Sequence, residues 1–589
     1  MWCVPAATDL AMSFTKIQRR LTSGESHGWP ENIHPVLRRI YAARGALHPG
    51  DVEYRLAALH TPQTLSGIAA ACELLANALR DDLRIVIVGD FDADGATGTA
   101  VAIRGLRMLG ARQVSYQVPN RFTHGYGLSP ALVETLLPQK PDLIITVDNG
   151  IASLPGVALA KTHGIAVLIT DHHLPGLQLP IADAIVNPNL DQDPFLSKAL
   201  CGVGVMFYLL LALRTHLRND GWFAARGIAE PDLSVLLDLV ALGTVADLVS
   251  LDFNNRILVE SGLKRIRAGR GCAGVRALID VSNRRVQAIT AADLGFALAP
   301  RINAAGRLED MALGIECLIT DDTARAQALA EQLSAINAER RELQVTMVEQ
   351  GEALVARWRA AHGADKLPVG VCLFEPDWHP GVVGLVASRL KESLHRPVVA
   401  CAPAGDDSDE LRASARSIPG FHIRDALAEV DARHPDLILR FGGHAMAAGL
   451  SLRAHNLHEF AAAFDAVAAE RLAPEQLEAV MLSDGELGAE DCTLALAQQL
   501  RYAGPWGQNF PEPVFDGEFT VESWRVVGET HLRLKLRPVS GAAAIDGILF
   551  GGYRGSPPPS RLRAAYQLDI NDWRGESSLQ LLLRHIEAV

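Results

Sequence analysis

The chain of 589 residues lacks an apolar run long enough to cross a membrane. Its longest uncharged apolar stretch, residues 199–213, is shorter than the roughly 18 residues that suggest a membrane span, and it is interrupted by glycine. Residues 1–15 also lack the basic start and apolar core of a signal peptide. We therefore expect residues 199–213 to form a buried helix in a cytoplasmic protein that does not interact with membranes.

Cysteine is scarce and scattered along the chain. No two of the eight cysteines are spaced as C-x-x-C, and this pattern argues against both a zinc ribbon and a disulfide framework. Reduced thiols, as found in a cytoplasm, fit the pattern best. The cysteines are Cys3, Cys72, Cys201, Cys272, Cys317, Cys372, Cys401 and Cys492.

Positive charge is in deficit. The formal net charge is −13 and the pI is near 5.8, which argues against a wide surface for nonspecific binding of duplex DNA. A narrow basic channel inside an acidic shell remains compatible with this balance, and bound cations would offset acidity that is concentrated in a metal site. The hydrophobic and charged fractions, 49% and 21%, are those of an ordinary globular protein. The length predicts about three or four domains.

What the chain does contain is a set of acidic and imidazole groups that follow hydrophobic runs. Three of these runs look like buried β-strands, at residues 84–89, 143–147 and 166–170, and a fourth is predicted as a helix over residues 233–249. The segments that follow or end these runs read Gly-Asp90-Phe-Asp92-Ala-Asp94-Gly95, Val-Asp148-Asn149-Gly150, Thr-Asp171-His172-His173 and Gly-Thr-Val-Ala-Asp247.

Strands and helices alternate between residues 82 and 191, and nearly continuous apolar strands are typical of a parallel sheet that is covered on both faces. Ligands of such sheets bind beyond the carboxyl ends of the strands. Because the acidic segments lie at those ends, we expect them to converge. Converging carboxylates and histidines build two-metal hydrolytic centres, so the pattern points to metal-assisted cleavage of a phosphate ester.

The same residues also have simpler explanations. Asp90, Asp92 and Asp94 could form a calcium loop or cap a helix N-terminus, although no Glu stands near the twelfth position that a calcium loop requires. A lone histidine is usually structural. His172 and His173 are adjacent at a strand end, which instead favours a ligand of Mn²⁺, Zn²⁺ or Fe²⁺.

Three further regions follow the acidic segments. A long helix is predicted over residues 323–362, where Gly and Pro are almost absent, and we interpret it as a connector between domains. A second α/β unit is predicted over residues 368–466. After residue 472 short alternating strands indicate a small β-barrel, and the clearest strand, residues 531–537, has one apolar and one basic face. That basic face either binds a single strand or is only solvated.

These motifs resemble those of the DHH phosphoesterase superfamily and, along nearly the whole chain, those of its RecJ family. The four acidic segments specify only the superfamily. The segment Pro300-Arg301-Ile-Asn303-Ala-Ala-Gly306-Arg307 and the C-terminal β region favour RecJ. Further matching motifs are Pro119-Asn120-Arg121-Phe122, Trp378-His379-Pro380-Gly381, Phe441-Gly442-Gly443-His444 and Gly504-Pro-Trp-Gly-Gln508.

The resemblance implies an α/β fold in which a parallel-sheet DHH domain is joined by a long helix to a smaller α/β DHHA1 domain across a cleft. A β-barrel OB-fold domain follows. The implied divisions are an N-terminal helical segment that packs on the core at 1–75, the DHH domain at 76–275, a helical connector at 276–362, the DHHA1 domain at 363–468 and a single-strand-binding OB-fold at 469–589.

By the same likeness, five residues would hold two Mn²⁺ or Mg²⁺ ions, with Asp90 and His173 beside them as further catalytic groups. The implied ligands are Asp92, Asp94, Asp148, His172 and Asp247. The implied substrate-binding residues are Arg121, Arg301, Asn303, Arg307, His379, Ser414, Arg416, Gly442, Gly443 and His444. Of these, Arg121 and either Arg301 or Arg307 would hold a 5′-terminal phosphate.

Three arginines are also candidates for phosphate binding on the basis of the residues around them. Arg121 stands in a loop just past a strand end, and Arg301 and Arg307 flank Asn-Ala-Ala-Gly, which is predicted as a turn that brings backbone N–H groups close to an anion. A single arginine is more often a plain surface charge. The family often has Gly-Ser-Gly-Arg where this chain has Ala413-Ser414-Ala415-Arg416, and the two extra methyl groups could restrict the approach of a DNA backbone.

The function implied by the resemblance is a 5′ to 3′ exonuclease specific for single-stranded DNA that releases mononucleotides. Roles in recombination and mismatch repair, with a helicase and a single-strand-binding protein as partners, are implied by the family alone. Two alternatives stay open: a phosphoesterase of short oligoribonucleotides, cyclic dinucleotides or bisphosphates, and a catalytically silent DNA-binding relative. The OB-like segment disfavours the first, and the complete set of expected metal positions disfavours the second.

Overall fold

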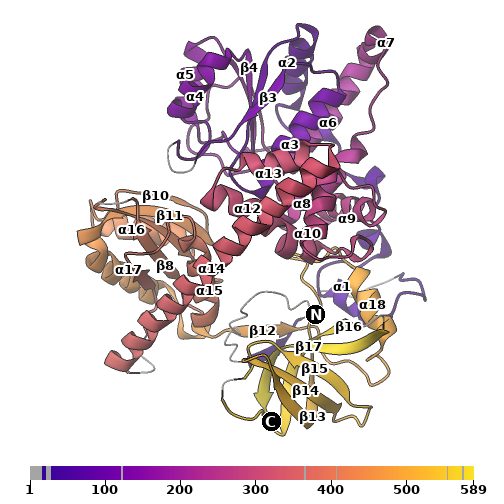
Figure 1. The fold of residues 1–589 in the computed structure, drawn as a ribbon, viewed down its shortest axis with the longest axis vertical. Coiled ribbons are helices and arrows are strands. Elements are labelled where there is room, and N and C mark those ends of the chain that lie inside the picture. The colour runs from indigo at the N-terminus through magenta and orange to yellow at the C-terminus, as the bar shows by residue number, and fades with distance from the viewer. Residues whose placement is uncertain are drawn as a thin grey trace.

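The computed structural model describes residues 16–21, 28–120, 124–363, 367–405, 408–553, 555–573 and 576–589. Figure 1 shows a first α/β unit at the top, a second α/β unit at the left and a barrel at the bottom, with one long helix running from the first unit to the second. Within the described residues, no helix has both the length and the apolar character needed to cross a bilayer. The seven described cysteines are all free thiols, so the prediction of no disulfide framework is confirmed for them.

The first unit is built on a five-stranded parallel sheet in the order β3-β2-β4-β5-β6. The three predicted strands are confirmed, each within a residue or two, and β3 and β6 extend the sheet on either side of them. The strands are β2 (Ile85–Val88), β3 (Val114–Gln117), β4 (Leu143–Val147), β5 (Ala166–Thr170) and β6 (Ala184–Val186). All residues of β2 and β4 are buried, as a sheet covered on both faces requires.

Helices cover both faces of this sheet, and the alternation of side chains along the strands decides which helices they touch. Ile85, Ile87 and Ile145 pack with α2 (Ile68–Arg80), α3 (Ala93–Met108), α6 (Gly202–Asn219) and α8 (Leu237–Ala246). Val86 and Ile144 pack on the other side, with α4 (Pro130–Leu136) and α5 (Leu154–Thr162). The predicted buried helix over residues 199–213 is therefore confirmed as the main part of α6.

A helical layer lies between the first unit and the rest of the molecule. It consists of α9 (Phe253–Arg267), α10 (Ala273–Val281), α12 (Ala299–Leu308), α13 (Ala312–Ile319) and the first half of α14 (Thr323–His362). The 40-residue helix α14 confirms the predicted connector and is about 60 Å long at 1.5 Å per residue. Asp322 begins it as an N-cap by accepting hydrogen bonds from the N–H groups of Ala324 and Arg325.

The prediction of a turn at Asn303–Gly306 is wrong, because these residues lie inside α12. The glycine is needed for packing instead. A Cβ atom at Gly306 would lie 2.0 Å from the carbonyl oxygen of Phe91, so α12 can touch the loop after β2 only through a residue without a side chain. The backbone of α12 thus packs directly against the backbone of the loop that carries Asp90 and Asp92.

The second α/β unit has a five-stranded mixed sheet in the order β10-β11-β9-β8-β7, in which only β7 and β8 are parallel. The strands are β7 (Val371–Phe374), β8 (Val398–Pro403), β9 (Glu410–Arg416), β10 (Arg440–Gly443) and β11 (Ala447–Arg453). Its helices are α15 (Val383–Leu394), α16 (Ile423–Arg433) and α17 (Leu457–Arg471). The predicted second unit over residues 368–466 is therefore confirmed.

The C-terminal part is a closed five-stranded barrel in the order β13-β14-β15-β17-β16, which confirms the predicted small barrel. The strands are β13 (Phe515–Val527), β14 (His531–Pro538), β15 (Ile545–Leu549), β16 (Arg561–Trp573) and β17 (Glu576–Ala588). The basic residues of β14 face local carboxylates. Arg533 and Lys535 lie 3.0 and 3.2 Å from Asp546, and Arg537 lies 2.6 Å from Glu522. This face is therefore already largely neutralised.

The N-terminal segment joins the barrel to the first unit, and it is not purely helical. Strand β1 (Lys16–Arg19) pairs in parallel with β12 (Val480–Ser483), just before the barrel. Helix α1 (Pro35–Ala42) then places Tyr41 against Trp506, with the Tyr41 hydroxyl donating to the Ala503 carbonyl at 2.9 Å. The prediction of a helical segment that packs on the core is thus wrong for β1, which packs on the C-terminal part.

Asp516 holds this junction together, and we expect its loss to destabilise the barrel. Burial would raise the pKa of Asp516, but hydrogen bonds from Arg19, Ser483 and Arg563 outweigh it and lower the pKa to about 2. This pKa lies below the value of about 3.9 for an aspartate in the unfolded chain. The ionised Asp516 carboxylate therefore stabilises the fold above pH ~4, and its contribution to the free energy of unfolding is lost as the pH falls toward 2. Asp516→Asn should cost about 2 kcal/mol at neutral pH.

Urea unfolding followed at pH 7 and at pH 3 checks this expectation, since the difference between Asp516→Asn and the wild type should shrink at the lower pH. Asp569→Asn is the matched control, because Asp569 is 42% exposed and pairs with Arg501 on the barrel surface. Such exposed pairs contribute less than about 1 kcal/mol. Equal effects of the two substitutions would contradict the role given to Asp516.

Candidate metal centre and the cleft beside it

The loop between β2 and α3 brings three aspartates to the carboxyl end of the sheet. Asp92 caps α3, with its carboxylate accepting from the Gly95 N–H at 3.0 Å. Asp94 lies in the first turn of α3, and its two oxygens accept from the Gly202 and Val203 N–H groups at 2.6 and 2.9 Å. The helix-cap explanation is therefore correct for Asp92 as a local role, and the positive ends of α3 and α6 both point at these carboxylates.

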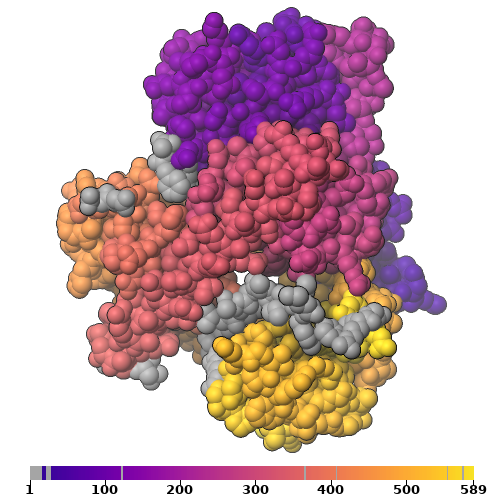
Figure 2. Space-filling model, in the orientation of Figure 1, coloured from indigo at the N-terminus to yellow at the C-terminus, as the bar shows by residue number. Residues whose placement is uncertain are grey.

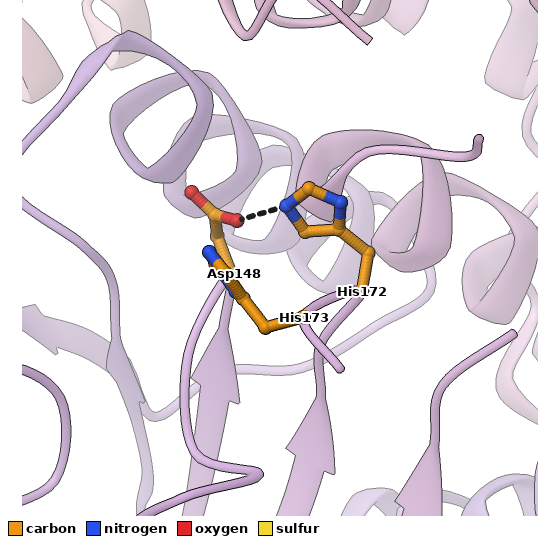
Figure 3. A group of neighbouring side chains, drawn as sticks. All are labelled: Asp148, His172 and His173. Carbon is orange, nitrogen blue, oxygen red and sulfur yellow. Dashed lines mark ion pairs between the residues drawn. The ribbon is translucent and has the colours of Figure 1, made fainter. Parts of the chain in front are cut away.

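Asp148 ends β4 in a left-handed conformation, with φ 65°, and its carboxylate is turned into the same space. Its Oδ1 atom lies 3.1 Å from Nε2 of His172, a contact marked by the dashed line in Figure 3, and the same Nε2 lies 3.5 Å from Oδ2 of Asp247. Asp148 Oδ1 and His172 Nε2 are buried and have no hydrogen-bond partner among the described residues. Buried carboxylate and imidazole atoms without hydrogen-bond partners are typical of a cation site.

The ligand atoms form three overlapping groups, in each of which all atoms lie within 4.8 Å of one another. The groups are Asp148 with His172 and His173, Asp94 with His172 and Asp247, and Asp90 with Asp92 and Asp148. Asp148 and His172 each belong to two groups. The predicted convergence of the four segments is thereby confirmed, and the overlap is the arrangement expected when neighbouring cations share ligands.

The electrostatics of this cluster are unfavourable without a cation. Burial, followed by repulsion from Asp92, raises the pKa of Asp94 to about 7. Burial and the neighbouring aspartates likewise raise the pKa values of Asp148 and Asp247 well above the ordinary range. Burial, followed by His173, lowers the pKa of His172 to about 4, so the imidazole is presented as a neutral ligand. A bound divalent ion would offset the electrostatic repulsion between these buried carboxylates.

Asp171, to which the sequence pattern assigned no role, holds His173 in place beside the ligand groups. It accepts hydrogen bonds from the N–H groups of Ile151, His172 and His173, and its Oδ1 lies 2.7 Å from Nδ1 of His173. Burial opposes protonation of His173, but Asp171 outweighs it and raises the pKa of His173 to about 8. The sequence could have indicated this role, since Asp171 stands directly before the two histidines at the end of β5.

The second unit reaches the centre through His444. Its ring stacks on His173 with centroids 5.9 Å apart and planes 23° apart, so the two units meet beside the metal ligands. His444 directly follows Gly442 and Gly443 in β10, and Gly443 has a φ of 141° that favours glycine. The sequence-predicted residues of the two units are therefore brought together at this point.

Ser414 and Arg416 occupy one face of β9, and Ala413 and Ala415 occupy the other. The two alanines pack in the core of the second unit, where Ala415 is fully buried. The expectation that their methyl groups could hinder DNA is wrong, because strand alternation turns them away from the cleft. Arg416 donates to Ser414 Oγ at 2.8 Å and Ser388 Oγ at 3.1 Å, so its guanidinium group is held in place by hydroxyl groups.

Helix α12 connects the loop after β2 with the second unit. The Asn303 side chain accepts from the Ala93 N–H at 2.8 Å, and Arg307 Nη1 donates to the Gly381 carbonyl at 3.2 Å. His379 Nδ1 accepts from the Gly381 N–H at 3.1 Å. Arg301 lies elsewhere: its Nε donates to Ser334 of α14 at 3.3 Å, about 200° around the helix from Asn303.

Arg121 lies outside the described residues. Asn120 and His124, which flank the undescribed segment, line a cavity of about 160 Å³ together with Phe91, Gly306 and Glu309. This cavity is adjacent to the α12 residue that precedes Arg307.

Three family models match the chain. The DHH family N-terminal domain matches residues 84–244, the DHHA1 domain matches residues 366–470 and the RecJ OB domain matches residues 483–585. These ranges correspond to the parallel-sheet unit, the mixed-sheet unit and the barrel.

Related proteins match over almost the whole length. The chain is 52% identical over 575 residues to the single-stranded-DNA-specific exonuclease RecJ of Dickeya dadantii, covering 97% of this chain and 99% of that protein. It is similar in structure to RecJ from Thermus thermophilus in complex with Mn²⁺, with a TM-score of 0.78, 32% identity, and coverage of 95% of this chain and 76% of that one. The complex of that protein with Mg²⁺ gives a TM-score of 0.72, 30% identity and coverage of 95% and 75%. The chain therefore belongs to the RecJ family.

Proposed function

We propose that this protein is a metal-dependent exonuclease that degrades single-stranded DNA from the 5′ end and releases mononucleotides. The observation that carries the proposal is the set of overlapping carboxylate and imidazole groups around Asp148 and His172, two of whose buried ligand atoms have no hydrogen-bond partner in the described part of the chain. The likeness of the whole chain to proteins named single-stranded-DNA-specific exonucleases supports the substrate. The 5′ to 3′ polarity rests on the family likeness.

The donor set fits Mn²⁺ or Mg²⁺. Carboxylates and one neutral imidazole suit Mn²⁺ best among the common hydrolytic ions, and the carboxylates alone suit Mg²⁺. The proposed ligands are Asp92, Asp94, Asp148, His172 and Asp247, with Asp90 and His173 beside them. When bound, such a pair of ions supplies an activated water and neutralises charge on the scissile phosphate and the leaving oxygen.

The chain's own residues would hold the substrate and control its protons. His173, fixed by Asp171, has an imidazole that faces both the ligands and His444, which suits it to contact the scissile phosphate. We propose that Arg307, together with Arg121, holds the 5′-terminal phosphate as a planar guanidinium fork. The remaining cleft residues that we propose to contact the strand are Asn303, His379, Ser414, Arg416, Gly442, Gly443 and His444.

The rival small-substrate phosphoesterase leaves part of the molecule without a role. A cavity of about 700 Å³ lies between the helical layer and the barrel, and it is lined by Arg284, Tyr502 and Gln567 among others. A substrate of two nucleotides gives a cavity at the barrel no evident role, whereas a long strand extends beyond the metal centre and can use further surfaces. The catalytically silent alternative is disfavoured because the described ligand set is complete.

We further propose a cytoplasmic location and action in DNA recombination and mismatch repair. A helicase that separates the strands and a single-strand-binding protein that covers them are the partners that such an activity needs. These roles are supported by family likeness.

A long single-stranded DNA labelled at either end tests the proposed function. With Mn²⁺ or Mg²⁺ we expect immediate release of a labelled mononucleotide from the 5′ end only. Chelator should abolish the release, and blunt duplex should not be cut. Turnover of short oligoribonucleotides or cyclic dinucleotides, with no cleavage of the long strand, would move the protein to the small-substrate group.

A further inference from the structure

Two asparagines contact the paired histidines from the turn that follows β6, the edge strand of the parallel sheet. The turn consists of Asn187, Pro188, Asn189 and Leu190, and the Asn187 carbonyl accepts from the Leu190 N–H at 3.3 Å. Asn187 Oδ1 also accepts from the Asn189 N–H at 2.8 Å. Proline fixes its own backbone angle and an asparagine side chain can bond to the backbone two residues on, so this sequence favours one defined turn.

The side-chain amides of these asparagines hold the backbone of the two histidines. Asn189 Nδ2 donates to the His172 carbonyl at 2.5 Å, and Asn187 Nδ2 donates to the His173 carbonyl at 2.9 Å. Asp171 accepts from the N–H groups of the same two histidines at 2.7 and 3.1 Å. The backbone of each histidine is therefore held at its N–H group from β5 and at its carbonyl group from the turn after β6.

Lys198 holds the turn from its other side. Its Nζ atom donates to the Pro188 carbonyl at 2.6 Å and to the Asp193 carbonyl at 2.7 Å. Asn187 is fully buried, whereas the Lys198 side chain is 48% exposed. The turn is thus anchored both in the interior of the first unit and at its surface.

This anchoring determines where the imidazole of His172 can lie. With the backbone held, only the two side-chain torsions remain to place Nε2, which lies 3.1 Å from Asp148 Oδ1 and 3.5 Å from Asp247 Oδ2 (Figure 3). His172 is also the ligand that distinguishes between cations. A carboxylate serves Mg²⁺ as well as Mn²⁺, whereas an imidazole nitrogen favours the transition metal.

We propose that Asn189 and Asn187 are positioning residues that set the preference of the metal centre for Mn²⁺ over Mg²⁺. They act through the backbone of His172 and His173. Groups that orient metal ligands typically contribute about 10- to 100-fold to metal affinity. Loss of the Asn189 hydrogen bond should loosen His172 and leave the carboxylates in place, so it should weaken binding of Mn²⁺ more than binding of Mg²⁺. The inference rests on the metal centre of the proposed function and does not involve the DNA.

The test measures metal binding to the metal-free protein, separately from cleavage. The EPR signal of free Mn²⁺ is lost on binding, so a titration gives the affinity for Mn²⁺, and competition gives that for Mg²⁺. Asn189→Leu keeps the size of the side chain and removes its donor. It should lower the affinity for Mn²⁺ at least about tenfold and that for Mg²⁺ less than about threefold. The ratio of single-turnover cleavage rates in limiting Mn²⁺ and limiting Mg²⁺ should fall accordingly.

A second variant and a matched control accompany this substitution. Lys198→Met loosens the turn from the surface, without a change in the protein interior, and should lower the affinity for Mn²⁺ by a smaller factor. Asn456→Leu is the control, because Asn456 also donates from its amide to a backbone carbonyl, that of Asp436, at 3.3 Å. It belongs to the second unit, the orange lobe at the left of Figure 2, and should leave both affinities unchanged. Thermal unfolding in chelator establishes that each variant is folded.

Equal losses of affinity for Mn²⁺ and Mg²⁺ would mean that the asparagines support the fold in general, and would overturn the inference. Unchanged Mn²⁺ affinity in both Asn189→Leu and Lys198→Met would overturn it as well. If Asn189→Leu does not fold, the affinities of Lys198→Met decide. A wild type that binds Mn²⁺ but does not cleave long single strands would refute the proposed function and leave the role of the asparagines standing.

Discussion

Asp148→Asn is expected to lower cleavage of single-stranded DNA by at least ~10³-fold while leaving binding of the strand intact. Asp148 belongs to two of the three groups of ligand atoms, so its replacement by a neutral amide weakens both. The substitution should also stabilise the metal-free protein by roughly 2–4 °C, because it removes one of several buried carboxylates that repel each other. Thermal unfolding in chelator, beside single-turnover cleavage with Mn²⁺, measures both effects.

Addition of Mn²⁺ should then make the wild type more stable than Asp148→Asn, the reverse of their order in chelator. A ligand that binds only the folded protein stabilises it in proportion to its affinity, so the wild type should gain more from Mn²⁺ than Asp148→Asn does. Asp220→Asn is the control in the same unit, since Asp220 is 38% exposed and pairs with Arg80. It should leave activity and the response to Mn²⁺ unchanged. Unfolding of Asp148→Asn in chelator would show that Asp148 serves the fold rather than a metal.

Gly306→Ala is the second substitution with a large expected effect, although Gly306 carries no functional group. The new Cβ would meet the Phe91 carbonyl oxygen at 2.0 Å and the carbonyl carbon at 3.0 Å. Because both atoms are backbone, the loop that carries Asp90 and Asp92 must move by about 1 Å, and displacements of this size cost on the order of 10²-fold in rate. We expect kcat to fall by about that factor and the affinity for Mn²⁺ to fall with it.

Gly295→Ala provides the comparison for this prediction. The nearest atom to its Cβ would be a side-chain methyl carbon, Val245 Cγ1, at 3.2 Å, and the Val245 carbonyl oxygen lies at an ordinary 4.0 Å, so small side-chain shifts can accommodate it. Alanine is favoured over glycine in a helix interior by about 1 kcal/mol, so neither substitution should weaken helix formation itself. Full activity and unchanged Mn²⁺ affinity in Gly306→Ala would mean that α12 does not position the metal loop.

The strands and the metal ligands could be predicted because local pattern and topology agree there. Short apolar runs of the length of β2, β4 and β5 are typical of buried strands in an alternating chain, and parallel strands bring their carboxyl ends to one edge. Asp90, Asp148 and His172 needed no further information to be placed together. Asp247 is different, because α8 and not the sheet delivers it, so the topology of the strands alone did not place it at the edge of the sheet.

The residues that the sequence placed wrongly are those decided by tertiary packing. Nothing local distinguishes a glycine that makes a turn from Gly306, which makes room for a neighbouring backbone. The role of Arg301 required the position of α14, a partner more than thirty residues away in the chain.

The pairing of β1 with β12 has a consequence for how the protein is made. Contacts such as Lys16 with Glu478 and Tyr41 with Ala503 join positions 462 residues apart, so a ribosome releases the first strand long before its partner exists. The N-terminal segment must wait unpaired through most of translation, and closing so long a loop is entropically costly. Once closed, the barrel is held from both ends of the chain and cannot swing out as a tethered module. The pairing of β1 with β12 can thus form only after residues 480–483 have left the ribosome.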